Sequence, residues 1–368
     1  MIYLDAAATT LEKPPQVRQA MAQAAAELST PGRGSHPAAR RAEETAFRCR
    51  AEAAALFGVP SPENVVFTMN ATHGLNIAIR SLVVPGSRVV ISGYEHNAVC
   101  RPLYAIPEVR LTVVDAPPFR REQAAEEFRR AILAGADAVI VNHVSNVFGC
   151  VQPLEEIAGV CRSRGVPLLV DASQSAGTLP LHLTELGAAF IAMPGHKGLY
   201  GPQGTGLLLC GERPARPLLL GGTGSASRDR QMPPTLPDRL EAGTHNMPGI
   251  AGLLEGLRFV RRRTPGAAAG GGGGAPPEGP AGGGGIHARK RPPSHRCGVL
   301  PGGGPGLRRA GGGAGTPGYR PAGGASLCAA GPPHGGDTGH RHGAPEPFRL
   351  QHSGANRKAG AGAAPAFS

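Results

Sequence analysis

The chain has 368 residues, which is long enough for two domains with a sizeable core. No apolar run is long enough to cross a membrane, and the opening text MIYLDAAATT lacks the basic segment of a signal peptide, so we expect a cytoplasmic protein that contacts no membrane. A net charge of +12 would suit a nucleic-acid binder, but most of the excess positive charge lies beyond residue 263.

Seven short apolar runs, rich in β-branched residues, predict strands in the first part of the chain. They are 65–68, 88–93, 110–115, 138–144, 166–172, 188–193 and 205–210. Amphipathic stretches such as 72–83 and 154–165 lie between them and predict helices. Several runs are apolar throughout, which is typical of parallel strands covered on both faces. Residues 1–263 are therefore predicted to form an α/β domain with a parallel sheet and helices on both faces.

Residues 264–368 have a different composition, dominated by Gly, Pro, Ala and Arg. Their only aromatic residues are Tyr319, Phe348 and Phe367, and neither a strand period nor a helix period is visible. Such a segment cannot bury enough apolar surface to offset its conformational entropy. It predicts a degenerate or disordered C-terminal region, which could be read as a linker or as an RNA-binding Gly/Arg tail.

A change of reading frame offers a sharper interpretation of this tail. When residues 339–368 are back-translated with GC-rich codons and shifted by one base, they permit DTGTVRLSPFAFNTPEQIEKLVQALRQLS. The text ASLCAAGPPHGG likewise permits LHCAPLAHRTEG. The shifted text is periodic and helix-forming, whereas the printed text is not. We therefore predict a frameshift near residue 265, either in the gene or in its sequencing.

Five polar residues follow the ends of predicted strands. They are Thr72, His96, Asn146, Asp171 and Lys197. Ligands of open parallel sheets bind beyond the carboxyl ends of the strands, so we expect these side chains to meet there. Each has a plainer interpretation when taken alone, as a helix cap, a turn former or a solvated surface charge. Together they are the residue types that pyridoxal phosphate (PLP) requires.

The chemistry of each residue supports a PLP site. Lys197 lies among glycines beside His196, and a Schiff-base lysine must be fixed and partly desolvated so that its amine is free at neutral pH. Asp171 ends an apolar strand, where a pyridinium nitrogen would be a suitable partner, and Gln174 is placed to reach the ring hydroxyl. The flat imidazole of His96 suits ring stacking and proton transfer.

The text NATHGLN opens a predicted helix at Ala71, Thr72 and His73. Backbone N–H groups and the positive end of a helix bind phosphate, although a lone Thr at such a place is more often only a cap. The start of this helix is therefore the predicted phosphate site.

With DASQSAG and GHKGLYGPQGTG in one frame, residues 1–263 resemble the class V aminotransferase-fold enzymes, which are PLP-dependent transferases of fold type I. This resemblance implies a mixed, mostly parallel sheet with helices on both faces. Within them the chain is most similar to the cysteine desulfurases, and the matching text includes YLDAAATT, PGRGSH, EHNAV, GGTGS and EAGTHNMPGI. The resemblance implies a homodimer that converts L-cysteine to L-alanine. The sulfur would be held as a persulfide on an enzyme cysteine and passed to an acceptor protein, as in iron–sulfur cluster assembly.

The resemblance also implies residue roles. Lys197 would hold PLP covalently and move the Cα proton, and His96 would stack on the ring. The remaining contacts to ring, substrate and phosphate would come from Asn146, Asp171, Gln174, Ala71, Thr72, His73 and His196, with Thr244 reaching in from the partner subunit.

Three departures from the family pattern stand out. Pro194 replaces a Ser or Thr that would bind phosphate, and Ala6 replaces an Asn. The nucleophilic cysteine and the substrate-binding arginine are readable only in the shifted frame, so we expect impaired desulfurase activity. A selenocysteine lyase, or another class V aminotransferase or β-lyase, is the alternative. A nucleic-acid binder using the tail is a distant one, because the tail lacks aromatic residues for base stacking.

Overall fold

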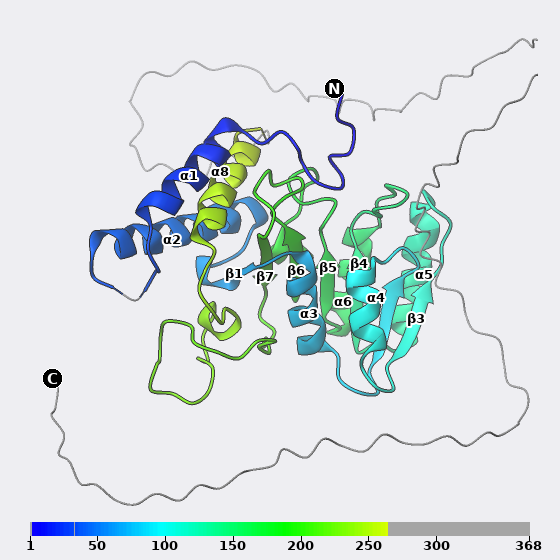
Figure 1. Ribbon diagram of the computed structural model, residues 1–368. Helices are drawn as coiled ribbons and strands as arrows, with labels where there is room; N and C mark the ends of the chain where they lie inside the picture. Colours follow the sequence, from blue (N-terminus) through cyan, green and yellow to red (C-terminus); the bar gives the residue numbers. More distant parts are fainter. Residues whose placement is uncertain (1, 33, 264–368) are drawn as a thin grey trace, which may run out of the picture. The chain divides into compact units, whose positions relative to one another are not determined.

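The computed structural model describes residues 2–32 and 34–263, shown in colour in Figure 1. Within them one sheet contains seven strands in the order β1-β7-β6-β5-β4-β2-β3. The strands are β1 (Val65–Thr68), β2 (Arg88–Ser92), β3 (Arg110–Val114), β4 (Ala138–Asn142), β5 (Leu168–Asp171), β6 (Phe190–Pro194) and β7 (Gly206–Cys210). Strand β7 runs antiparallel to β1 and β6, and the other pairs are parallel. The predicted mixed, mostly parallel sheet is confirmed.

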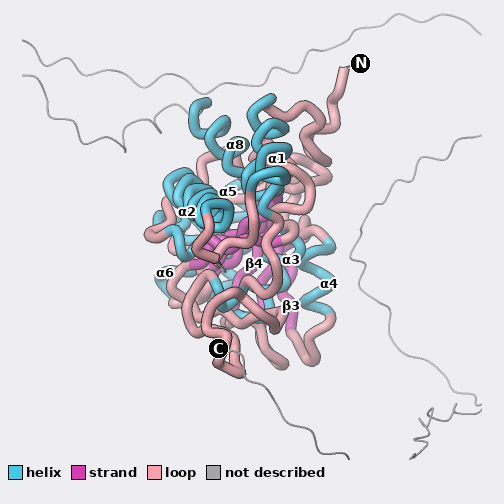
Figure 2. The backbone as a smooth tube through the Cα atoms, turned by 60° about the vertical axis from the view of Figure 1, so that its left-hand side comes forward, coloured by secondary structure: helices cyan, strands magenta, loops and turns pink. Residues whose placement is uncertain are grey.

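Helices cover both faces of this sheet. They are α1 (Pro15–Glu27), α2 (Pro37–Phe57), α3 (Ala71–Leu82), α4 (Asn97–Tyr104), α5 (Arg121–Leu133), α6 (Leu154–Arg164), α7 (Leu183–Leu186) and α8 (Met247–Arg263), with 3-10 turns η1 (Pro62–Asn64) and η2 (Asp238–Leu240). One apolar cluster joins the sheet to α2, α5, α6, α7 and α8, and a second joins it to α3 and α4. Figure 2 shows α6 and the α3–α4 pair on opposite sides of the magenta strands.

Alternation along each strand divides its side chains between the two clusters. Val139 and Val141 of β4 belong to the α6 side, whereas Ile140 belongs to the α3 side. All residues of β4 are buried, because helices lie on both of its faces. The continuous apolar runs of the sequence have this packing as their physical cause.

Local signals in the sequence set the helix ends near the sheet. Helix α6 ends at Gly165, which adopts a left-handed conformation (φ 65°) that glycine tolerates without steric cost. Helix α3 begins after Asn70, whose side chain accepts a hydrogen bond from the His73 N–H at 2.9 Å. His96 caps α4 in the same way, with Nδ1 accepting from the Ala98 N–H at 3.0 Å.

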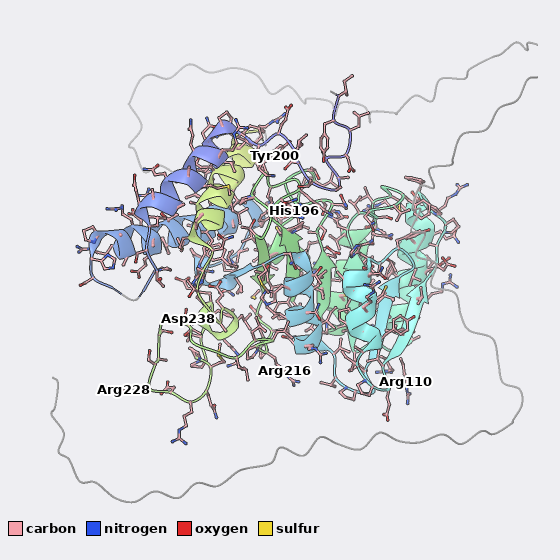
Figure 3. The ribbon with its side chains drawn as sticks, viewed as in Figure 1. Arg110, His196, Tyr200, Arg216, Arg228 and Asp238 are labelled. Carbon is pink, nitrogen blue, oxygen red and sulfur yellow. The ribbon has the colours of Figure 1, made fainter. Side chains whose placement is uncertain are left out.

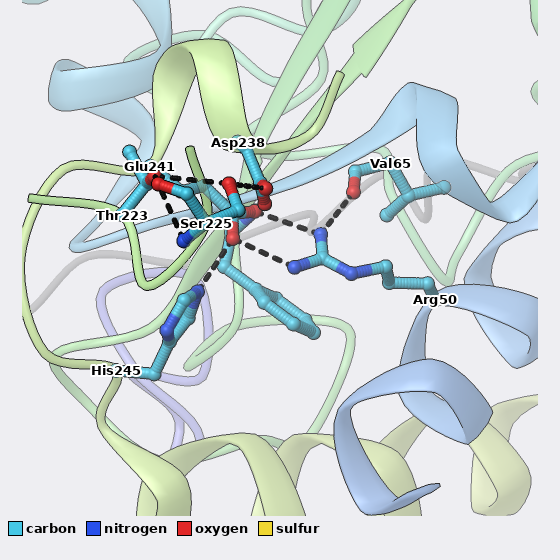
Figure 4. A network of polar contacts seen from close by, with 8 residues as sticks. Arg50, Val65, Thr223, Ser225, Asp238, Glu241 and His245 are labelled. Carbon is cyan, nitrogen blue, oxygen red and sulfur yellow. Dashed lines mark hydrogen bonds and ion pairs between the residues drawn. The ribbon is translucent and has the colours of Figure 1, made fainter. Parts of the chain in front are cut away.

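A buried ion pair anchors the long connection between β7 and α8 (Figure 4). Glu241, beside η2, accepts hydrogen bonds from Arg50 of α2 and from the backbone N–H of Phe67 in β1 at 2.6 Å. His245 contacts the same carboxylate through Nε2 at 2.5 Å. The connection is thereby tied to the far end of the sheet at β1.

The tail, its predicted disorder and the domain boundary at residue 264 fall outside the described residues and stay predictions. In the part of the chain that the structure describes, no helix combines the length and apolarity that a membrane crossing requires.

Candidate active site

A cavity of about 280 Å³ lies at the carboxyl ends of β2, β4, β5 and β6. Its lining includes the predicted site residues Ala71, Thr72, His96, Asn146, Asp171, Gln174, His196 and Lys197. Parallel strands bring their carboxyl ends to one edge of a sheet, so residues far apart in sequence meet there. The structure therefore brings most of the predicted constellation together in one place.

Lys197 stands in the turn after β6, three residues beyond the strand. Burial lowers the pKa of its amine below the usual value, and the negative charge of Asp171 partly opposes this shift. No ion pair to Lys197 is found among residues 2–32 and 34–263. A larger share of its amine is thus neutral near pH 7 than for a solvated lysine, as a nucleophilic lysine needs.

The backbone of this turn leaves no space for a side chain at Gly198. A Cβ placed on Gly198 would lie 2.3 Å from the carbonyl oxygen of Ala176, in the segment that follows Asp171. A Cβ on Gly177 would lie equally close to the carbonyl oxygen of Gly198, and Gly177 also has a left-handed conformation (φ 79°). Two glycines thus let the Asp171 and Lys197 segments lie in direct backbone contact.

Asp171 is buried at the end of β5, with 4% of its surface exposed. Its Oδ1 accepts hydrogen bonds from the backbone N–H of Ser173 at 2.9 Å and from the Ser173 hydroxyl. Burial raises the pKa of the carboxyl, while the Ser173 hydrogen bonds and the charges of His96 and Lys197 lower it in part. A carboxylate placed here gains from a cationic partner inside the cavity.

The beginning of α3 forms another part of the wall, with Asn70, Ala71 and Thr72 lining the cavity. The first N–H groups of a helix lack partners within the helix, and the helix end carries a partial positive charge. This wall is therefore suited to an anion such as a phosphate group.

His196 lies beyond one end of the sheet (Figure 3), and both it and the next residue, Lys197, line the cavity. Its Nδ1 is buried and has no hydrogen-bond partner within the described part of the chain. Burial lowers the pKa of the imidazole, and the neighbouring lysine charges lower it further, so the ring is neutral near pH 7. A polar atom in this state is available to a bound ligand.

The N-terminal segment packs against the lysine turn. The carbonyl oxygen of His196 accepts hydrogen bonds from the backbone N–H of Thr10 at 3.0 Å and from the hydroxyls of Thr9 and Thr10. Gln174 donates from Nε2 to the carbonyl oxygen of Ala7 at 3.3 Å. In this structure the amide of Gln174 therefore contacts the N-terminal segment. To make the predicted contact with a ring oxygen, Nε2 would have to donate to that oxygen instead of to Ala7.

Sequence reasoning missed part of the lining. The cavity is also lined by Ala8, Asn70, Ala98, Asn142, Val144 and Ser173, and by Pro194, which the sequence had singled out as a departure from the family pattern. Asn142 ends β4 in register with Asp171, and Ser173 lies two residues beyond that aspartate. The predicted strand 138–144 placed Asn142 inside the strand, whereas β4 ends at Asn142, so the error at this strand end hid the residue.

Two predicted site residues lie elsewhere. His73 and Thr244 line a second cavity of about 180 Å³, together with Glu241 and His245. His73 follows Thr72 on α3, but its side chain is directed to this second cavity and its Nε2 has no partner within residues 2–32 and 34–263. The predicted role of Thr244 in a partner subunit stays a prediction.

No thiol of the described residues lines the Lys197 cavity. Cys49, Cys100, Cys150, Cys161 and Cys210 are all buried. Burial raises the pKa of Cys161 to about 12, which disfavours the reactive thiolate. The remaining cysteines, Cys297 and Cys328, lie outside the described residues.

Together, a mixed sheet covered by helices and a lysine cavity at its carboxyl edge define the fold of the type I PLP-dependent enzymes. The family model "Aminotransferase class-V" matches residues 2–268, and the chain belongs to that family.

Several of the proteins that it is similar to are named cysteine desulfurases. A probable cysteine desulfurase from Methanothermobacter thermautotrophicus is 35% identical over 276 residues, which cover 71% of this chain and 67% of the relative. The apo structure of the cysteine desulfurase from Thermococcus onnurineus NA1 aligns with a TM-score of 0.63 and 29% identity, covering 71% of this chain and 67% of that chain. A structure titled SspA in complex with cysteine aligns with a TM-score of 0.59 and 26% identity, covering 70% of this chain and 72% of that chain. The match spans between 40% and 67% of the length of the first curated relatives.

Proposed function

We propose that this chain binds PLP through Lys197 and has the active site of a cysteine desulfurase. The observation that carries the proposal is the placement of Lys197, Asp171 and the start of α3 around one cavity. A lysine with a lowered pKa, a buried carboxylate and a helix start supply one partner each for the aldehyde, the ring nitrogen and the phosphate.

The residues present fit the cofactor. Lys197 would hold it, Asp171 would bind the ring nitrogen, and the N–H groups of Ala71 and Thr72 would bind the phosphate. His96 lines the cavity, and because its Nδ1 accepts from the Ala98 N–H, its Nε2 carries the ring proton in the neutral form. When bound, PLP supplies an electron sink for the bonds at the substrate Cα.

The proposed substrate is L-cysteine, in line with the named activity of the relatives. Asn146 would lie beside the substrate carboxylate, and Lys197 would move the Cα proton. The proposal includes a cytoplasmic homodimer, in which Thr244 contributes across the interface, and a protein acceptor for the sulfur.

We further propose that the printed chain lacks most of the desulfurase step. A nucleophilic thiolate must stand opposite the substrate sulfur, yet none of the described cysteines reaches the cavity. The family match ends at residue 268, close to the change of composition at residue 264. A frameshift near residue 265 accounts both for the end of the family match and for the missing nucleophilic cysteine.

The proposal is tested by titrating the full chain with PLP and recording the visible absorbance of the lysine-bound cofactor. Lys197→Ala should abolish the band. Lys13→Ala is the matched control, since Lys13 is the other lysine of residues 1–263, is also partly buried, and lies outside the cavity lining. Folded protein without a band, or a band that survives in the Lys197 variant, would contradict the proposal.

A further inference from the structure

Glu95 lies one residue before His96, in the turn between β2 and α4, and has no role in the site as described above. Its Oε1 accepts a hydrogen bond from the Ser92 hydroxyl at 2.5 Å and another from the backbone N–H of Asn142 at 2.8 Å. Ser92 ends β2 and Asn142 ends β4. One carboxyl oxygen therefore joins the carboxyl ends of two neighbouring strands.

Asn142 connects this carboxyl to the cavity. It is paired in register with Asp171 and lines the same cavity. Its Nδ2 donates to the carbonyl oxygen of Tyr94 at 2.6 Å, and its Oδ1 lies 3.2 Å from the Ser92 hydroxyl. These contacts close a ring of hydrogen bonds around the turn that precedes α4, and this turn carries the His96 imidazole.

The second carboxyl oxygen of Glu95 is in a different environment. The residue as a whole is half-buried, but Oε2 is shielded from solvent and has no hydrogen-bond partner in the described part of the chain. Burial raises the pKa of this carboxyl to about 8, the Ser92 and Asn142 hydrogen bonds lower it in part, and the charge of Asp171 raises it.

No cation forms an ion pair with Glu95 within residues 2–32 and 34–263. On α4, Cys100 contacts the main-chain carbonyl of Glu95 at 3.8 Å rather than its carboxyl, and His96 uses Nδ1 to cap the helix. The carboxyl therefore carries its proton at neutral pH.

We propose that Glu95 is a positioning residue that acts in its neutral form, fixing His96 and Asn142 beside Asp171 without a second negative charge there. The inference rests on the proposed function, because that function assigns the roles of His96 and Asp171. With Glu95 neutral, a bound cofactor would have Asp171 as the single carboxylate partner for its ring nitrogen. An ionised Glu95, beyond β2 and bonded to the end of β4, would add a second negative charge near Asp171 of β5 and compete for the same pyridinium charge.

The first test uses circular dichroism of bound PLP, which reports how the ring is oriented in the full chain. Glu95→Gln keeps a neutral hydrogen-bond acceptor and should retain the wild-type signal near neutral pH. Glu95→Ala should still bind PLP through Lys197 but lose most of the signal, because the His96 turn and Asn142 lose their common partner. Glu122→Gln, at an exposed glutamate in α5, is the control and should change nothing.

The second test needs no cofactor. Because the folded state raises the pKa of Glu95, it holds the proton more tightly than the unfolded chain does. Glu95 therefore contributes stability at low pH that is lost as the pH rises through about 8. As the pH rises from about 4.5 to about 8, the melting temperature of the wild type should fall more than that of Glu95→Gln, which cannot ionise.

The outcomes separate this inference from the proposed function. A wild-type circular dichroism signal in Glu95→Ala, or the same pH dependence of melting in Glu95→Gln as in the wild type, would overturn the role of Glu95. If Glu95→Ala does not fold, the pH series with Glu95→Gln decides. A wild type that binds no PLP would refute the proposed function, and the melting series would still decide whether Glu95 is neutral.

Discussion

Glu241 accepts two hydrogen bonds from Arg50, each 2.7 Å long, although 191 positions separate the two residues in the chain. Both side chains are almost fully buried, with 10% of Arg50 and 4% of Glu241 exposed. Burial by itself would raise the pKa of Glu241, but the Arg50 charge and the His245 contact outweigh burial and lower it. The carboxylate is therefore ionised near neutral pH.

The Arg50→Ala variant should lose about 3–5 kcal/mol of unfolding free energy, because it removes the guanidinium that pairs with the buried Glu241 charge and leaves only His245 and the Phe67 N–H beside it. Arg48→Ala is the matched control on the same helix. Arg48 pairs with Glu44 at the surface, where 58% of its side chain is exposed, and its loss should cost less than about 1 kcal/mol. Urea denaturation measures both values. Similar losses for the two variants would show that the buried pair does not anchor the connection to α8.

A Gly198→Ala substitution should displace the lysine turn, because its Cβ would lie 2.3 Å from the Ala176 carbonyl oxygen. We expect weaker PLP binding and a lower melting temperature. Gly159→Ala is the control, since a Cβ at this position on α6 meets nothing within 4 Å and alanine favours a helix. Unchanged PLP affinity in Gly198→Ala would mean that the close backbone contact is not needed for the site.

The Asp171→Asn substitution should lower the pKa of Lys197 further in the cofactor-free protein. Burial already lowers this pKa, and the negative charge of Asp171 opposes the effect by favouring the charged amine. Removing that charge should therefore shift the midpoint of amine acylation to lower pH. Competitive labelling read by mass spectrometry follows Lys197 and, as an internal control, Lys13, whose lowered pKa has burial as its cause. A midpoint that stays or rises for Lys197 would contradict the electrostatic coupling.

Restoring the frame near residue 265 should restore turnover of L-cysteine. The shifted text supplies a cysteine and an arginine, and correct substrate orientation contributes several kcal/mol to a barrier. Alanine and sulfide release are compared for the printed and the repaired chain under the same PLP saturation. Equal turnover by the two chains would show that the tail is not where the reaction is lost.

The sequence was most informative about the strands. Apolar β-branched runs such as 138–144 are typical of strands in a sheet that is covered on both faces. All seven strands were therefore found, with small errors at their ends. Polar residues after those runs led to Lys197 and Asp171, because the edge of a parallel sheet gathers them.

Other features of the site depend on where a side chain points and on which distant residues it contacts, and the sequence pattern indicates neither. His73 adjoins Thr72 in sequence, yet the turn of α3 directs it to the second cavity. Glu95 had no signal of its own, since its role depends on contacts with the ends of two strands. The Arg50–Glu241 pair joins residues too far apart in the chain for spacing to indicate it.

Every residue that lines the Lys197 cavity lies between Ala8 and Lys197, and the strand that completes the sheet, β7, ends at Cys210. All of these residues precede residue 265 in the order of translation, so the proposed change of frame would not alter any of them. The proposed change of frame would thus keep the part of the protein assigned to binding and replace the part that we propose completes the chemistry. The product of such a gene would bind its proposed coenzyme without catalysing the desulfurase reaction.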